Sequence, residues 1–295
     1  MLPFYLIIVA SCGLAVISSG TAAHAGASPS MVSSEMARQR RHHFVLVHGF
    51  GHGAWCWFKV ATALEAAGHR VTVLDMAACG ASAVRAEDVP SLEEYSRPLL
   101  DAVAALPDGE RAVLVGHSFG GISLALAMER HPEKVAAAVF VTAAMPPVGK
   151  PMTFVFQQNS QRRDPMDNTI RTIGDPKNPD QIVLFGPKYM ARTMYQLSPA
   201  EDLTLARAMV RPSRRFWNDT TFNGDGVLTA GRYGAVRRVF VVVEDDASSL
   251  TPEFQRRMVS WSPGTEVRGL RGADHMAMFS KPTELSELLI EIAGK

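Results

Sequence analysis

Short apolar runs alternate with amphipathic stretches along most of the chain beyond residue 42. Strand-like runs occur at residues 43–47, 70–74, 112–115, 135–141, 238–243 and 265–270. Helical periodicity covers residues 55–67, 91–106 and the stretch leading up to 130, and a last helix follows residue 275. Strands and helices that alternate in this way are typical of a parallel, doubly wound α/β sheet.

The region from residue 145 to 231 breaks this alternation. It is rich in Pro, Gln, Asn and Arg, with short helical patterns at 187–197 and 199–210. We expect a mainly helical cap, inserted at the carboxyl edge of a core made of residues 42–144 and 232–295. Apolar cap residues that could line a substrate pocket are Phe154, Phe156, Phe185, Tyr189, Met194, Leu197 and Phe216.

The first 25 residues differ from the rest of the chain. Residues 2–19 are apolar and uncharged, and Ala23-His24-Ala25 has the small-x-small form of a signal-peptidase site. We therefore expect a signal peptide over 1–25 and a polar linker over 26–41. Because no Lys or Arg precedes the long apolar run, an uncleaved anchor and a misassigned start codon stay open as alternatives. Cleavage would make the protein secretory or extracellular, with no stable membrane partner; without use of the leader it would be cytoplasmic.

Composition narrows the classes of function. Of the 295 residues 47% are hydrophobic, enough for a sizeable core, and the net charge of +1 with scattered Arg gives no basic footprint for nucleic acid or an anionic membrane. A small, largely neutral substrate fits this balance better. The sequence has no metal-binding Cys or His spacing and no phosphate loop, so we expect no cofactor and no metal. We interpret Cys56 and Cys79 as buried thiols.

The most informative motif is Gly116-His117-Ser118-Phe119-Gly120, which lies between an apolar strand and a helix. A serine on such a sharp turn has a strained backbone, and the strand and helix crowd the turn. The positions two residues before and after the serine, Gly116 and Gly120, must therefore lack side chains. The turn lifts the hydroxyl above the sheet, and the amide of Phe119 at the start of the helix can stabilise an oxyanion. Ser118 is therefore a candidate nucleophile.

A serine nucleophile needs a base and an orienting acid further along the chain. His275 follows a short strand in the loop Gly272-Ala273-Asp274-His275, whereas His131 reads as a helix terminus. The acid should follow the buried strand 238–243, where Glu244-Asp245-Asp246 stands. At least two of these three carboxylates are expected to belong to a solvated turn.

Several blocks of sequence resemble one family at matching separations. The chain is similar to the plant methylesterase and hydroxynitrile lyase family of α/β-hydrolases from about residue 42 to the C-terminus. The blocks are His43-Phe44-Val45-Leu46-Val47-His48-Gly49, His52-Gly53-Ala54-Trp55, Leu64-Glu65-Ala66-Ala67-Gly68-His69, Gly116-His117-Ser118, Phe185-Gly186-Pro187-Lys188, Pro252-Glu253-Phe254-Gln255 and Gly272-Ala273-Asp274-His275-Met276-Ala277-Met278.

The resemblance implies an α/β-hydrolase fold and a catalytic triad. Ser118 would be the nucleophile and His275 the base. An ungapped alignment of the strand before Glu244 places the acid at Asp246, while a shifted register would favour Asp245. The oxyanion donors would be the amides of Phe50 and Phe119.

Within this family, lyases resemble the esterases but differ at three positions near the substrate. They carry threonine, glutamate and lysine where this chain has Gly49, His117 and Met276. Without a cation beside the base, cyanide expulsion loses electrostatic support, whereas ester hydrolysis needs only the triad, the oxyanion hole and water. The resemblance therefore favours an esterase, with Met276 and the cap contacting the acyl part.

The expected activity is hydrolysis of methyl esters of small hormone acids, namely methyl salicylate, methyl jasmonate or methyl indole-3-acetate. The alternatives are a hydroxynitrile lyase and a non-catalytic protein that binds a small acid hormone. An intact triad would argue against a purely binding role. The resemblance to this family also implies a homodimer as the assembly.

Overall fold

The computed structural model describes residues 41–159 and 164–295. The predicted signal peptide over 1–25 and all but the last residue of the predicted linker lie outside the described residues. The described residues belong to one compact unit, which spans residues 40–295.

A six-stranded sheet forms the centre of this unit. All of its neighbouring strands are parallel, in the order β2-β1-β3-β4-β8-β9. The strands are β1 (His43–Val47), β2 (Arg70–Leu74), β3 (Ala112–His117), β4 (Val135–Val141), β8 (Arg238–Val243) and β9 (Glu266–Leu270). These bounds agree closely with the predicted runs, because β1, β3 and β8 are buried along their whole length and are apolar except for one residue at an end of each strand.

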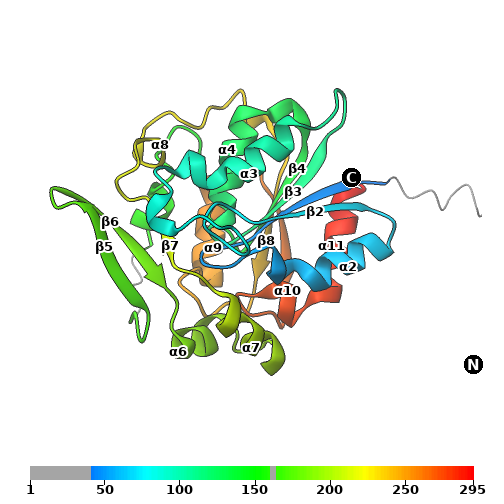
Figure 1. The fold of residues 1–295 in the computed structure, drawn as a ribbon. Helices are drawn as coiled ribbons and strands as arrows, with labels where there is room; N and C mark the ends of the chain where they lie inside the picture. Colours follow the sequence, from blue (N-terminus) through cyan, green and yellow to red (C-terminus); the bar gives the residue numbers. More distant parts are fainter. Residues whose placement is uncertain (1–40, 160–163) are drawn as a thin grey trace, which may run out of the picture. The chain divides into compact units, whose positions relative to one another are not determined.

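Helices cover both faces of the sheet (Figure 1). One apolar cluster joins the sheet to α3 (Leu92–Ala104), α4 (Gly120–Arg130) and α9 (Pro252–Ser260). A second joins the other face to α2 (Phe58–Ala66), α10 (Ala277–Ser280) and α11 (Pro282–Ala293). Ser91 caps the start of α3, since its side chain accepts a hydrogen bond from the Glu94 amide. Short helices lie at η1 (Ala54–Trp57), η2 (Ala86–Asp88), η3 (Pro132–Lys134) and η5 (Tyr233–Ala235).

The segment between β4 and β8 contains both helices and a small sheet. Its helices are α5 (Phe154–Gln157), α6 (Pro187–Tyr189), the π-helix η4 (Met190–Met194), α7 (Ala200–Met209) and α8 (Thr220–Asn223). The two predicted helical stretches correspond to α6 with η4 and to α7. An antiparallel sheet of β5 (Thr169–Asp175), β6 (Asn178–Leu184) and β7 (Ser213–Arg214) was not predicted; Figure 1 shows β5 and β6 as a long green hairpin.

Two further expectations concern the described part of the chain. Cys56 and Cys79 are both free and buried, as predicted. Within residues 41–159 and 164–295, no helix combines the length and the apolar character needed to cross a membrane.

Candidate active site

The site lies at the carboxyl ends of the parallel strands. Ser118 directly follows β3, the loop after β1 carries Phe50, and the loop after β8 carries Asp246. His275 follows β9. Because the strands are parallel, these four loops meet at one edge of the sheet, which is where ligands bind in open α/β folds.

Ser118 occupies a strained turn. Its φ is +53°, in the left-handed region that non-glycine residues rarely adopt. A Cβ at Gly116 would lie 2.9 Å from the Leu124 methyl carbons, and one at Gly120 would lie 2.6 Å from the His48 carbonyl oxygen. Any side chain at either position would therefore collide with its surroundings, as the sequence motif predicts.

Ser118, His275 and Asp246 form a continuous chain of hydrogen bonds. His275 Nε2 lies 3.1 Å from Ser118 Oγ, and His275 Nδ1 lies 2.8 Å from Asp246 Oδ2. Since a carboxylate can only accept, Nδ1 carries the proton and Nε2 is free to accept the serine proton. The geometry is that of a nucleophile, a base and an orienting acid.

Of the two candidate acids, only Asp246 contacts His275. Asp245 is exposed and accepts a hydrogen bond from the Gly272 amide at 2.8 Å, so it belongs to the solvated turn. Glu244 pairs with Arg256 at 2.6 Å. The ungapped alignment of the strand therefore places the acid where the structure has it.

Asp246 is buried and well supplied with donors. Its carboxylate accepts from Thr142 Oγ1 at 2.6 Å and from the Ser248 amide at 2.7 Å, besides His275. Burial alone would raise the pKa of Asp246, but His275 and these hydrogen bonds hold it below its ordinary value. Asp246 therefore stays ionised at neutral pH. Ser248 also places its hydroxyl 3.1 Å from His275 Nδ1.

The predicted oxyanion donors are the amides of Phe50 and Phe119. Both residues line the cavity above Ser118, and their rings meet edge to face with centroids 5.6 Å apart. Within the described chain, neither amide donates to a protein acceptor. Both amides are thus available to a ligand oxygen.

The Phe50 loop is held by a residue of the cap segment. His52 Nδ1 donates to the Phe50 carbonyl oxygen at 2.9 Å, and the Tyr195 hydroxyl donates to His52 Nε2 at 2.7 Å. Burial lowers the pKa of His52 to about 3, so the imidazole is neutral and this bonding pattern is fixed. Tyr195 thereby positions the loop that carries one oxyanion donor.

His117 forms a hydrogen bond to the backbone of the base, His275. Its Nε2 donates to the His275 carbonyl oxygen at 2.8 Å, while its buried Nδ1 has no partner in the described residues. Burial, reinforced by His275 and His52, lowers the pKa of His117 well below its usual value. A Cβ at Gly49 would lie 2.8 Å from this Nδ1 and 2.8 Å from Ser118 Cβ, so His117 fills the space that a side chain at Gly49 would need.

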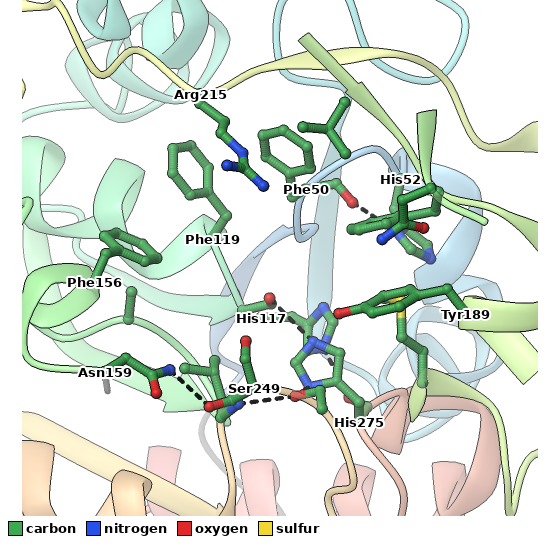
Figure 2. A pocket seen from close by; sticks show the side chains of 18 of the residues that line it. Phe50, His52, His117, Phe119, Phe156, Asn159, Tyr189, Arg215, Ser249 and His275 are labelled. Atoms are coloured by element: carbon green, nitrogen blue, oxygen red, sulfur yellow. Dashed lines mark hydrogen bonds between the residues drawn. The ribbon is translucent and has the colours of Figure 1, made fainter. Parts of the chain in front are cut away.

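The cavity above Ser118 has a volume of about 460 Å³, and six of the residues that border it are Phe, Tyr or Trp (Figure 2). Of the predicted lining residues, Phe156, Phe185, Tyr189 and Met194 border it, as does His117.

Five predicted contacts are not among the residues that border the cavity. Gly49 lies beneath His117, and Met276 is fully buried in the core against α10 and α11, so we correct the expectation that they contact the acyl part. Phe154 packs on Trp261, Leu197 is 49% exposed, and Phe216 is buried in the core.

Several residues of the site were missed from the sequence. Thr142, Ser248 and Tyr195 carry common polar groups in loops. Thr142 and Tyr195 directly follow β4 and η4, and Ser248 lies in the loop after β8, so only these positions could have singled them out. Arg215 also borders the cavity and was not predicted. In the described residues no cluster of three or more His, Cys, Asp or Glu side chains could hold a metal ion.

Comparison with known proteins agrees with this fold. The model of the "Alpha/beta hydrolase family" matches residues 44–288. The crystal structure of polyneuridine aldehyde esterase superposes with a TM-score of 0.81 at 38% identity, covering 86% of this chain and 100% of that one.

Two plant relatives narrow the class. "Probable esterase PIR7A" from Oryza sativa subsp. indica is 57% identical over 256 residues, which is 86% of this chain and 97% of the relative. "Methyl jasmonate esterase 1" from Vitis vinifera is 44% identical, again over 86% of this chain and 97% of the relative. The chain belongs to the plant methylesterase family of α/β-hydrolases and is a carboxylic ester hydrolase.

Proposed function

We propose that the protein is a serine esterase that hydrolyses methyl esters of small carboxylic acids, among them the hormone esters methyl salicylate, methyl jasmonate and methyl indole-3-acetate. The observation that carries the proposal is the chain of hydrogen bonds from Ser118 through His275 to Asp246 at one side of an aromatic cavity. The activity named in the grape relative supports the substrate class.

The proposed reaction has two halves. His275 Nε2 takes the proton of Ser118 as its hydroxyl attacks the ester carbonyl, and Asp246 stabilises the imidazolium that forms. The amides of Phe50 and Phe119 donate to the tetrahedral oxyanion. Methanol leaves with the proton from His275, and water then attacks the acyl-enzyme with the same base.

Cyanohydrin cleavage is disfavoured by the residues around Ser118. The lysine that handles cyanide in lyases is replaced by the buried Met276, and the threonine hydroxyl cannot be accommodated at Gly49 while His117 is present. Neutral imidazoles at His52 and His117 supply no cation for a departing anion. These features support an esterase over a lyase.

The test compares hydrolysis of the three hormone methyl esters with cyanide release from mandelonitrile, in the wild type and in Ser118→Ala. We expect methyl ester turnover that is lost by about a thousandfold or more in the variant. Cyanide release without ester cleavage would overturn the proposal in favour of a lyase. Tight binding of the free acids without turnover of any ester would overturn it in favour of a hormone-binding protein.

A further inference from the structure

One charged side chain borders the otherwise neutral cavity. Arg215 directly follows β7, and Figure 2 shows its guanidinium pointing toward the cavity. Its Cζ atom lies over the Trp217 ring, 6.0 Å from the ring centroid. Among the described residues that border the cavity, Arg215 is the only one with a permanent charge, and none is acidic. The ester site therefore contains a cation without a matching anion.

The neighbouring Arg214 forms a salt bridge of the kind that stabilises a fold. Arg214 Nε donates to Asp180 Oδ2 at 2.6 Å, and Asp180 is fully buried. Arg215 instead donates from Nη1 to the neutral Gln181 Oε1 at 2.8 Å. Within residues 41–159 and 164–295 its guanidinium has no other side-chain acceptor and no salt bridge. Most of its five N–H groups are thus open to a ligand.

The environment of Arg215 makes an anionic ligand favourable. The side chain is half-buried, and burial lowers the pKa of the guanidinium although Tyr189 and Asp180 oppose this effect. Removing part of the water around a cation costs free energy when no counter-ion replaces it. A ligand carboxylate bound to the guanidinium would offset this desolvation cost. The planar guanidinium also matches a carboxylate with two parallel hydrogen bonds, which a neutral ketone or hydroxyl cannot form.

We propose that Arg215 selects esters whose acyl part carries a second, free carboxylate, so that the preferred substrate class is the monomethyl esters of dicarboxylic acids. The inference rests on the proposed function, because the methyl ester must sit at Ser118. Its acyl chain spans the aromatic cavity, and its distal carboxylate binds Arg215. Hydrolysis releases methanol and leaves a dicarboxylate.

The test measures kcat/KM for matched monomethyl and dimethyl esters of succinic, adipic and suberic acid. We expect the wild type to prefer the monomethyl ester by about tenfold or more at the chain length that spans the cavity, mainly through a lower KM. Raising the salt from 0.05 to 0.5 M should reduce this preference, since the pair is only half-buried. Dicarboxylates should also inhibit hydrolysis of a neutral ester more strongly than the corresponding monocarboxylates.

Variants assign the preference to this residue. Arg215→Gln should bring the ratio of monomethyl to dimethyl turnover toward one, and Arg215→Lys should retain part of it. Arg192→Gln is the matched control, since Arg192 is an exposed cap arginine that does not border the cavity, and it should keep the wild-type ratio.

Three outcomes would overturn the inference. The first is equal turnover of the monomethyl and dimethyl esters at every chain length, and the second is an unchanged ratio of their turnover in Arg215→Gln. The third is that a methyl ester with a neutral ketone in place of the distal carboxylate is preferred over the dimethyl ester as strongly as the monomethyl ester is. The salt and inhibition measurements use only the wild type, so they still test the inference if Arg215→Gln does not fold. If the wild type cleaves none of the monomethyl, dimethyl and hormone esters, the proposed function itself fails. Turnover of neutral esters without a preference for the carboxylate would contradict only the role of Arg215.

Discussion

Acidification should destabilise this protein through a cluster of three buried histidines beside Ser118. We define the histidine cluster as His48, His52 and His117, all fully buried. His48 donates from Nδ1 to the Gly49 carbonyl oxygen at 2.7 Å and accepts from the Met76 amide at 3.0 Å. Each imidazole of the cluster thus has at most one nitrogen that donates. Protonation would add a second buried N–H, which would face the Met76 amide at His48, displace the Tyr195 hydroxyl proton at His52 and lack an acceptor at His117.

The sign and size of the effect follow from proton linkage. Burial lowers the pKa of all three histidines, so between pH 7 and 5 the unfolded chain binds more protons than the folded protein, and stability must fall as the pH falls. His52 has a pKa of about 3 and that of His117 is well below 6.5. His52 should therefore cost about 2 kcal/mol of unfolding free energy between pH 7 and 5. His117 and His48 add to this loss in the same direction, so the expected loss is about 2 kcal/mol or more.

The assay is urea unfolding followed by circular dichroism at half-unit steps from pH 7 to 5, with linear extrapolation to water. In His52→Gln the loss between pH 7 and 5 should shrink by about 2 kcal/mol, because one linked proton is removed. His131→Gln, at the end of α4 and outside the cluster, leaves the cluster intact and is the matched control. Because each variant is compared with itself across pH, a general loss of stability does not affect the result. An unfolding free energy that changes by less than 1 kcal/mol over this range would refute the reasoning.

Two further predictions concern the identity of the acid and the space around the base. Asp246→Asn should lower kcat/KM by about a thousandfold or more, since the amide no longer fixes the tautomer of the base, while Asp245→Asn should stay within about twofold of the wild type; similar losses in both variants would contradict the assignment. Gly49→Thr should lower kcat by about a hundredfold, because its Cβ would lie 2.8 Å from both His117 Nδ1 and Ser118 Cβ. Adding His117→Ala should recover part of that loss, and a fully active single variant would show that the two positions do not compete for space.

The core of the fold could be predicted because the inner strands of its sheet, β1, β3, β4 and β8, are buried on both sides. A run such as Val-Phe-Val-Val-Val at residues 239–243 has to be apolar at every position, because helices cover both faces of the sheet there. The same logic placed Ser118 and His275, since the ends of parallel strands converge at one edge. The choice between Asp245 and Asp246 depends on one residue of register, which the structure provides through the contact with His275.

The cap could not be predicted to the same depth, because its residues follow no simple period. β5 is mostly exposed, so it carries polar residues and lacks the apolar alternation of a half-buried strand. Arg215 belongs to a polar stretch and looks like a surface residue, and only the folded chain brings it to the cavity. Met276 shows the opposite failure: its position next to the base in sequence suggested a substrate contact, yet its side chain packs into the core.

The bridge from Tyr195 through His52 to the Phe50 carbonyl has a practical consequence for engineering. A designer who replaces the cap with that of a relative, in order to change substrate preference, would also replace the hydroxyl that anchors the loop after β1. Such a chimaera would bind its new substrate beside a loosened oxyanion donor, and its turnover would fall for a reason unrelated to fit. Transplants should therefore retain a tyrosine at this position, so that selectivity can be altered independently of rate.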